Sequence, residues 1–133
     1  MLNPYITQVK ESALYVADLA RTHRFYHELL GFPVIARKEG RHVFYQAGNT
    51  VLLCFLAKAT ARDSMLPPHF GSGKLHLAFE VPAGQYAEVK QMVEAAGIAI
   101  KHVQEWYPGV ESFYFRDPDQ HSLEIIPSGM WGI

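Results

Sequence analysis

The chain has a single cysteine, Cys54, so no disulfide framework can form within it. Cys54 lies in an apolar run and is predicted to be a small core residue. No apolar run approaches the ~20 residues that a membrane-spanning helix needs. The N-terminus also lacks the basic and then apolar pattern of a secretory signal peptide. We therefore expect a cytoplasmic protein.

An excess of charge of either sign is also absent. Twelve Lys and Arg residues and 13 Asp and Glu residues give 133 residues a formal net charge of −1. This balance offers no electrostatic footprint for nucleic acid or an anionic membrane, so we expect neither of them as a partner. With 49% hydrophobic and 19% charged residues, the composition is that of an ordinary globular protein, and the length suffices for one domain with a real core.

The most informative stretch is 113–126, in which an aromatic segment and an aliphatic segment flank a turn at Asp117-Pro118-Asp119. This pattern predicts a β-hairpin. Because side chains alternate along a strand, Glu124 points away from the face that carries Leu123 and Ile125. A carboxylate in so apolar a strand is costly to bury unless it is paired or binds a cation. The alternative is a glutamate on a solvated face of the sheet.

One order of elements occurs twice along the chain. The first half is predicted to contain a helix at 19–30, capped by Asp18 and stopped by Gly31, and strands at 11–16, 33–37, 41–47 and 50–56. The second half is predicted to contain a helix at 85–96, a turn at 106–109, and strands at 75–81, 98–104 and in the hairpin. A linker at 57–72, with a short helix near 59–62, separates the halves. Each half is βαβββ and cannot bury both of its faces alone, so the two must pair.

Three segments carry a family resemblance. Leu14-Tyr15-Val16-Ala17-Asp18-Leu19, together with Phe25-Tyr26 and Leu30-Gly31, resembles the opening of the glyoxalase/bleomycin resistance/dioxygenase family, the vicinal oxygen chelate superfamily. His76-Leu77-Ala78-Phe79 resembles the start of its second module, and Phe115-Arg116-Asp117-Pro118-Asp119 with Leu123-Glu124-Ile125 resembles its closing hairpin. The resemblance implies an α+β fold in which two βαβββ modules form a cupped eight-stranded mixed sheet. It also implies one domain over 1–133, with modules at about 8–56 and 73–127, the linker at about 57–72 and a tail at 128–133.

The resemblance further implies a divalent metal site on the inward faces of the modules. Its ligand positions match Glu11, His76 and Glu124, whereas the fourth position falls on Leu53, which cannot bind a metal. Three protein ligands leave positions open for a substrate. These ligands suit Fe, Mn, Ni, Co or Zn, and the sequence does not choose among them.

A substrate pocket can also be sketched from strand alternation and from the resemblance. Its predicted wall contains Tyr15, Leu53, Phe55, Tyr114 and Ser122, although for Phe55 a position in the plain core is the preferred interpretation. Tyr114 resembles the tyrosine that extradiol dioxygenases place beside substrate. Of the remaining histidines, His23 and His27 are predicted to be solvated on one helix face, His121 to be exposed in the hairpin turn, and His102 to be structural. His42 and His69 are predicted to be near the cavity mouth.

Three functions are open at this point. The first is a metal-dependent enzyme of lyase or isomerase type, which holds a substrate with vicinal oxygens, stabilises an enolate, and uses Glu11 or Glu124 as the base and Tyr114 as a hydrogen-bond donor. The second is a ring-cleaving extradiol dioxygenase. Two features weaken this hypothesis: no histidine lies in the region before Phe113, and the turn carries Gln120. The third is a non-enzymatic binding protein of the bleomycin-resistance type.

The resemblance also implies a homodimer. The C-terminal residues 129–133 include Met130, Trp131 and Ile133, and such an apolar tail is costly to leave in water. The tail is therefore expected either to contact a second copy or to fold back on its own chain.

Overall fold

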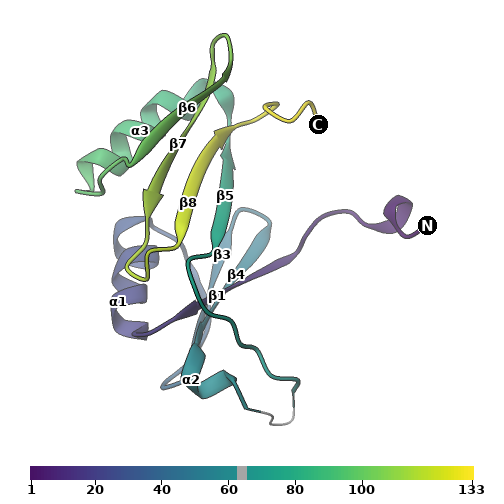
Figure 1. The fold of residues 1–133 in the computed structure, drawn as a ribbon, viewed down its shortest axis with the longest axis vertical. Coiled ribbons are helices and arrows are strands. Elements are labelled where there is room, and N and C mark those ends of the chain that lie inside the picture. Colours follow the sequence, from purple (N-terminus) through teal and green to yellow (C-terminus); the bar gives the residue numbers. More distant parts are fainter. Residues whose placement is uncertain (63–65) are drawn as a thin grey trace. The chain divides into compact units, whose positions relative to one another are not determined.

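A computed structural model describes residues 1–62 and 66–133 and divides the chain into two units, Met1–Ser72 and Gly73–Ile133 (Figure 1). Residues 63–65 of the predicted linker lie outside the described residues. Each unit contains one four-stranded mixed sheet and the βαβββ order. The predicted α+β class with two βαβββ modules is therefore confirmed. Among the described residues, the strands form two four-stranded sheets.

The first unit is organised around four strands, β1 (Glu11–Val16), β2 (Val34–Lys38), β3 (His42–Ala47) and β4 (Thr50–Leu56). Their order in the sheet is β1-β4-β3-β2, with β1 and β4 parallel and the other pairs antiparallel. The helical segments are η1 (Asn3–Tyr5), α1 (Leu19–His23), η2 (Arg24–Leu29) and α2 (Ala57–Thr60). Each predicted strand of this half is present within one residue at its ends.

The predicted helix 19–30 is present, but its second half is a π-helix, η2. Asp18 caps α1 as expected, because its side chain accepts a hydrogen bond from the Arg21 backbone N–H at 2.9 Å. Gly31 follows at φ +76°, a conformation that glycine adopts without steric cost. Nothing in the apolar spacing indicated the wider π turn, which sequence periodicity does not distinguish from an α turn.

Strand alternation separates two faces of the first sheet. One face carries the core, and its buried members include Leu14, Val16, Val43, Tyr45, Leu52 and Cys54. The register aligns Glu11, Ala13 and Tyr15 of β1 with Val51, Leu53 and Phe55 of β4, and these residues share the opposite face. The prediction that Cys54 is a core residue is confirmed, since it is fully buried.

The second unit repeats this arrangement with β5 (His76–Val81), β6 (His102–Tyr107), β7 (Val110–Arg116) and β8 (Ser122–Pro127), in the order β5-β8-β7-β6. Its helical segments are η3 (Ala83–Gln85) and α3 (Tyr86–Ala95). The strand predicted at 98–104 is wrong at both ends. Ile98 instead closes the helix, where its N–H donates to the Val93 carbonyl at 3.2 Å, and β6 extends through Trp106 into the predicted turn.

The first unit allows a sharp test of packing at Gly71. A Cβ added there would lie 2.6 Å from two ring carbons of Tyr15, and this ring is in turn packed against Phe55 and Phe70. We expect Gly71→Ala to lower the free energy of unfolding by about 1–3 kcal/mol, the usual cost of overpacking. Gly84→Ala is the matched control, because an added Cβ there meets no heavy atom within 4 Å. Chemical denaturation measures both, and equal stabilities would contradict the packing.

Among the described residues, we find no helix whose length and apolar character would let it cross a membrane.

Candidate functional site

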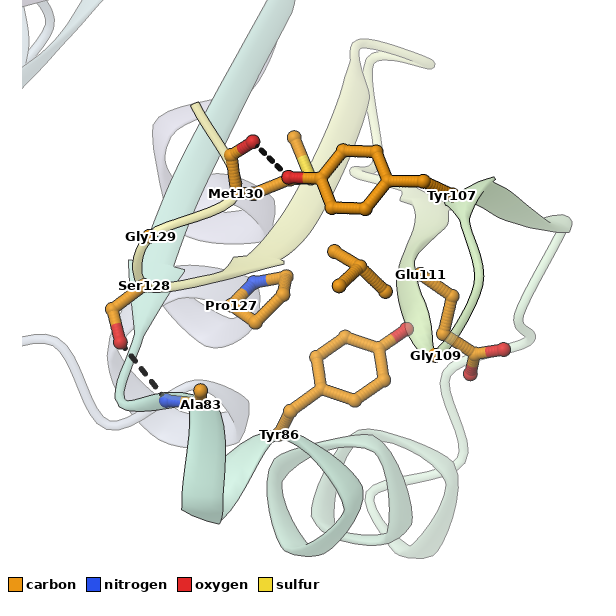
Figure 2. Close-up of a pocket in the computed structure, with 10 residues that line it drawn as sticks. Ala83, Tyr86, Tyr107, Gly109, Glu111, Pro127, Ser128, Gly129 and Met130 are labelled. Atoms are coloured by element: carbon orange, nitrogen blue, oxygen red, sulfur yellow. Dashed lines mark hydrogen bonds between the residues drawn. The ribbon is translucent and has the colours of Figure 1, made fainter. Parts of the chain in front are cut away.

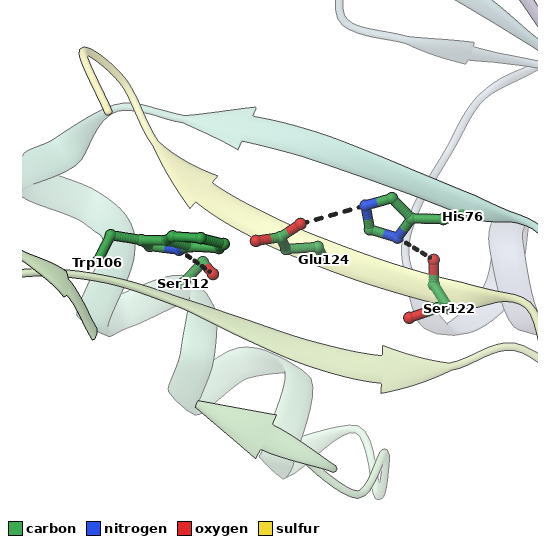
Figure 3. A network of polar contacts seen from close by, with 5 residues as sticks. All are labelled: His76, Trp106, Ser112, Ser122 and Glu124. Carbon is green, nitrogen blue, oxygen red and sulfur yellow. Dashed lines mark hydrogen bonds and ion pairs between the residues drawn. The ribbon is translucent and has the colours of Figure 1, made fainter. Parts of the chain in front are cut away.

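A histidine and a glutamate meet on one face of the second sheet. Strands β5 and β8 run parallel, with His76 aligned to Ser122 and Ala78 aligned to Glu124. His76 Nε2 lies 3.3 Å from Glu124 Oε2, and His76 Nδ1 lies 2.9 Å from the Ser122 carbonyl oxygen (Figure 3). Since a carbonyl only accepts, Nδ1 carries the proton and donates. A neutral His76 therefore directs its Nε2 lone pair at the carboxylate.

Glu124 is buried in this arrangement. It is 5% exposed, and its Oε1 is a buried atom with no hydrogen-bond partner among the described residues. The alternative of a glutamate on a solvated face is therefore wrong, because the side chain is almost fully buried. An unpartnered carboxylate oxygen beside an imidazole lone pair is an arrangement that a bound cation would satisfy. The donors present thus fit a divalent metal.

Tyr114 lies next to this pair. The β7–β8 register places it directly opposite Glu124, and its ring centroid is 6.1 Å from that of His76. Burial raises the pKa of the Tyr114 phenol, and the neighbouring Glu124 carboxylate raises it further. The phenol therefore stays protonated at neutral pH and can donate a hydrogen bond towards the pair.

The remaining predicted ligand, Glu11, belongs to the first unit. It is the first residue of β1 and is exposed. Within the part of the chain that the structure describes, no three His, Cys, Asp or Glu side chains form a group that could hold a metal ion. The second unit thus supplies two donors, His76 and Glu124. Leu53, at the fourth position, is buried and apolar.

The predicted wall residues divide between the units. Tyr15, Leu53 and Phe55 share a face of the first sheet with Glu11. Phe55 is 5% exposed and packs against the rings of Tyr15 and His69, at centroid distances of 6.2 and 4.8 Å, which favours its alternative role as core. In the second unit, Ser122 contributes its carbonyl to His76 and is aligned with it.

The prediction of an exposed His121 is wrong. It is 1% exposed, and its Nδ1 accepts a hydrogen bond from the Leu75 backbone N–H at 2.9 Å. Asp117 fixes the same turn, because its Oδ1 accepts from the backbone N–H groups of Asp119 and His121, both at 2.9 Å. The location of His121 in a turn favoured an exposed side chain. Buried polar contacts instead hold this turn and position β8 beside β5.

The two helix histidines differ from each other. His27 is exposed as predicted, whereas His23 is half-buried and its Nδ1 has no hydrogen-bond partner among the described residues. Their rings stack at 4.7 Å. Burial lowers the pKa of His23, and the charge of His27 lowers it further, so His23 favours the neutral form.

A pocket lies on the other face of the second sheet. It has a volume of about 200 Å³ and is bounded by η3, the start of α3, the β6–β7 turn and the tail (Figure 2). The rings of Tyr86 and Tyr107 face it from opposite sides, and the Tyr107 hydroxyl donates to the Met130 carbonyl. Tyr86 also packs against Phe113, which places the pocket on the face opposite Tyr114. The tail thus folds back at Met130, while Trp131 remains 71% exposed.

Several known proteins are similar to this chain in sequence. The model of the Glyoxalase/Bleomycin resistance protein/Dioxygenase superfamily matches residues 6–125. The glutathione transferase FosA of Serratia marcescens is 36% identical over 112 residues, which cover 84% of this chain and 74% of that protein.

Two solved structures show the same fold. Lactoylglutathione lyase from Agrobacterium tumefaciens superposes with a TM-score of 0.90 and 30% identity, over 96% of this chain and 98% of that one. A mutant of the fosfomycin resistance protein FosX from Listeria monocytogenes, complexed with Mn(II) and 1S,2S-dihydroxypropylphosphonic acid, superposes with a TM-score of 0.65 and 21% identity, over 91% and 90% of the chains. The chain therefore belongs to the Glyoxalase/Bleomycin resistance protein/Dioxygenase superfamily.

Proposed function

We propose that this chain is a divalent-metal-dependent enzyme that acts on a small substrate with two neighbouring oxygen atoms. The observation that carries the proposal is the His76–Glu124 pair. His76 Nε2 and Glu124 Oε2 lie 3.3 Å apart, and the other carboxylate oxygen, Oε1, is buried without a hydrogen-bond partner among the described residues. A divalent cation bound by both side chains would satisfy the buried carboxylate oxygen.

His76 Nε2 and the Glu124 carboxylate would hold the metal, and we propose Glu11 as the third donor because it occupies the remaining family ligand position. The Ser122 carbonyl fixes the tautomer and orientation of His76, as outer partners of ligating histidines usually do. When bound, a divalent ion acts as a Lewis acid that polarises the substrate oxygens. Two carboxylates and one imidazole suit Fe, Mn, Ni, Co or Zn, and the Mn(II) in the FosX complex makes Mn(II) the first to test.

The chain's own residues would divide the remaining work. Tyr114 donates a hydrogen bond to a substrate oxygen, since its phenol stays protonated beside Glu124. Glu11 or Glu124 exchanges a proton with the substrate. A metal-held carboxylate is a weak base, so the reacting proton must be acidified by chelation first.

The names of two relatives support a proposal for the substrate class. One is named a glutathione transferase and the other a lactoylglutathione lyase, so we propose a thiol of the glutathione type as the co-substrate or as part of the substrate. The lyase or isomerase reaction and the thiol transfer are then the two reactions to try first. The extradiol reaction lacks a comparable observation in its favour.

A screen would separate these functions from a binding protein. Purified protein would be assayed with Mn(II), Fe(II), Ni(II) and Zn(II) against α-ketoaldehyde–glutathione adducts, electrophiles for glutathione conjugation and catechols. We expect turnover with one of the two thiol classes and its loss after chelation. Ligand binding that survives complete chelation, without turnover anywhere in the screen, would favour the binding protein instead.

Tyr114 provides a specific prediction within this proposal. Tyr114→Phe should lower kcat by about 10-fold or more, because one hydrogen bond to a charged group contributes about 1.5–3 kcal/mol. Its metal content should stay at the wild-type level, since the phenol is not proposed as a ligand. Steady-state kinetics and elemental analysis measure the two quantities. A parallel loss of metal would show that Tyr114 serves the metal site rather than the substrate.

The homodimer and the cytoplasmic location remain predictions. The exposed Trp131 and Ile133 support the first, because they leave apolar area in water. Light scattering at micromolar concentration measures the mass, and a monomer mass near 15.0 kDa would exclude the dimer.

A further inference from the structure

A row of side chains crosses the second sheet from the metal pair to its edge. Glu124 on β8 is aligned with Tyr114 on β7, and Tyr114 is aligned with His102 on β6. The His102 ring lies 5.9 Å from the Tyr114 ring, while the His76 ring lies 6.1 Å from it. Tyr114 therefore has an imidazole near it on each side, and only one of the two contacts Glu124.

The hydrogen bonds of His102 fix which of its nitrogens carries the proton. The Gln104 side-chain amide donates to the Glu105 carbonyl at 2.8 Å, which identifies its nitrogen and leaves its oxygen as an acceptor. His102 Nε2 lies 3.1 Å from that oxygen, Gln104 Oε1. Because the oxygen only accepts, Nε2–H must donate. In a neutral His102 the lone pair therefore resides on Nδ1.

The position and the exposure of His102 would let its Nδ1 contact an incoming reactant. Two strand spacings of about 4.8 Å place the His102 backbone about 10 Å from that of Glu124. No group of three metal-ligating side chains that includes His102 is found among the described residues, but a substrate that extends from the pair over Tyr114 would end near His102. The residue is exposed and lies on the edge strand β6, so a second reactant can approach it from solvent.

We propose that His102 accepts the proton of the thiol co-substrate, and that Gln104 is the positioning residue that holds its tautomer. The S–H bond breaks, the proton moves to Nδ1, and the electron pair stays on sulfur, so no oxidant or reductant is required. The thiolate formed is the nucleophilic form of a thiol. This inference rests on the proposed function and adds a separate base for the proton of the thiol co-substrate.

The test measures thiolate formation rather than turnover. Glutathione is added at neutral pH to protein as purified and to protein after chelation, and the ultraviolet absorbance of the thiolate is recorded. We expect a thiolate signal in the wild type in both states and a fall of at least about tenfold in His102→Gln. Gln104→Leu should show a smaller fall. His27→Gln, which alters an exposed histidine of the other unit, should match the wild type.

Two results would overturn the inference. One is a wild type that forms no thiolate at saturating glutathione, and the other is a His102→Gln variant that forms as much thiolate as the wild type. The His76→Ala variant distinguishes failure of this inference from failure of the proposed function. It should lose the metal and retain the thiolate signal of chelated protein, whereas an unchanged metal content would count against the metal site alone.

Discussion

His76→Ala is expected to weaken the binding of a divalent metal by more than about 100-fold, beyond the 10- to 100-fold effect that follows loss of an outer partner of a metal ligand. The variant removes the imidazole nitrogen that faces Glu124 Oε2 at 3.3 Å. It leaves a buried carboxylate whose Oε1 already has no hydrogen-bond partner among the described residues. A single carboxylate in the second unit is a poor site for a transition metal.

Isothermal titration with Mn(II) and Zn(II) measures this change. His27→Ala is the matched control, because it removes an exposed histidine from the first unit and should leave the affinity unchanged. His121→Ala would be a poor control, since the His121 ring is buried and accepts the Leu75 N–H. Equal affinities for the wild type and His76→Ala would show that the pair is not the metal site.

Glu124→Gln should stabilise the metal-free protein and remove most of the stabilisation that a bound metal provides. In metal-free protein, the variant replaces a buried carboxylate, 5% exposed, by an amide that can donate to His76 Nε2. We expect it to be more stable than the wild type by about 1–3 kcal/mol, the usual cost of an unsatisfied buried polar group. A metal at a thousand times its Kd should then stabilise the wild type by about 4 kcal/mol. It should stabilise the variant little, because a neutral amide is a weaker ligand.

Thermal unfolding with and without Mn(II) reports both parts of this prediction. Glu105→Gln is the control for loss of one negative charge, because Glu105 is exposed on the edge strand β6. A metal-free Glu124→Gln that is less stable than the wild type would indicate that the carboxylate has a structural partner. Equal stabilisation of both proteins by Mn(II) would place the ion elsewhere.

The parts of the site that follow from local pattern were predictable. The alternation along 122–126 and the turn chemistry of 117–119 place Glu124 on one face, and they bring Tyr114 opposite it in the β7–β8 register. The parallel pairing that puts His76 beside β8 came from the repeat and the family resemblance, since no local pattern specifies a long-range neighbour.

The parts that depend on tertiary contacts were not predictable. The buried state of His121 depends on the distant Leu75 N–H, and a turn by itself favours exposure. His102 was expected to be structural, and its alignment with Tyr114 was not predicted, since the strand was placed at 98–104 and β6 spans His102–Tyr107. A strand boundary error of this size changes which residues share a row across the sheet.

A crystal structure of protein grown with Mn(II), with data collected at the manganese absorption edge, tests the metal site most directly. The account predicts one anomalous peak within about 2.0–2.3 Å of both His76 Nε2 and a Glu124 carboxylate oxygen, with further oxygen donors around it. A peak at another group of side chains, such as the stacked His23 and His27, would contradict the account. So would crystals in which Mn(II) at millimolar concentration leaves no peak beside Glu124.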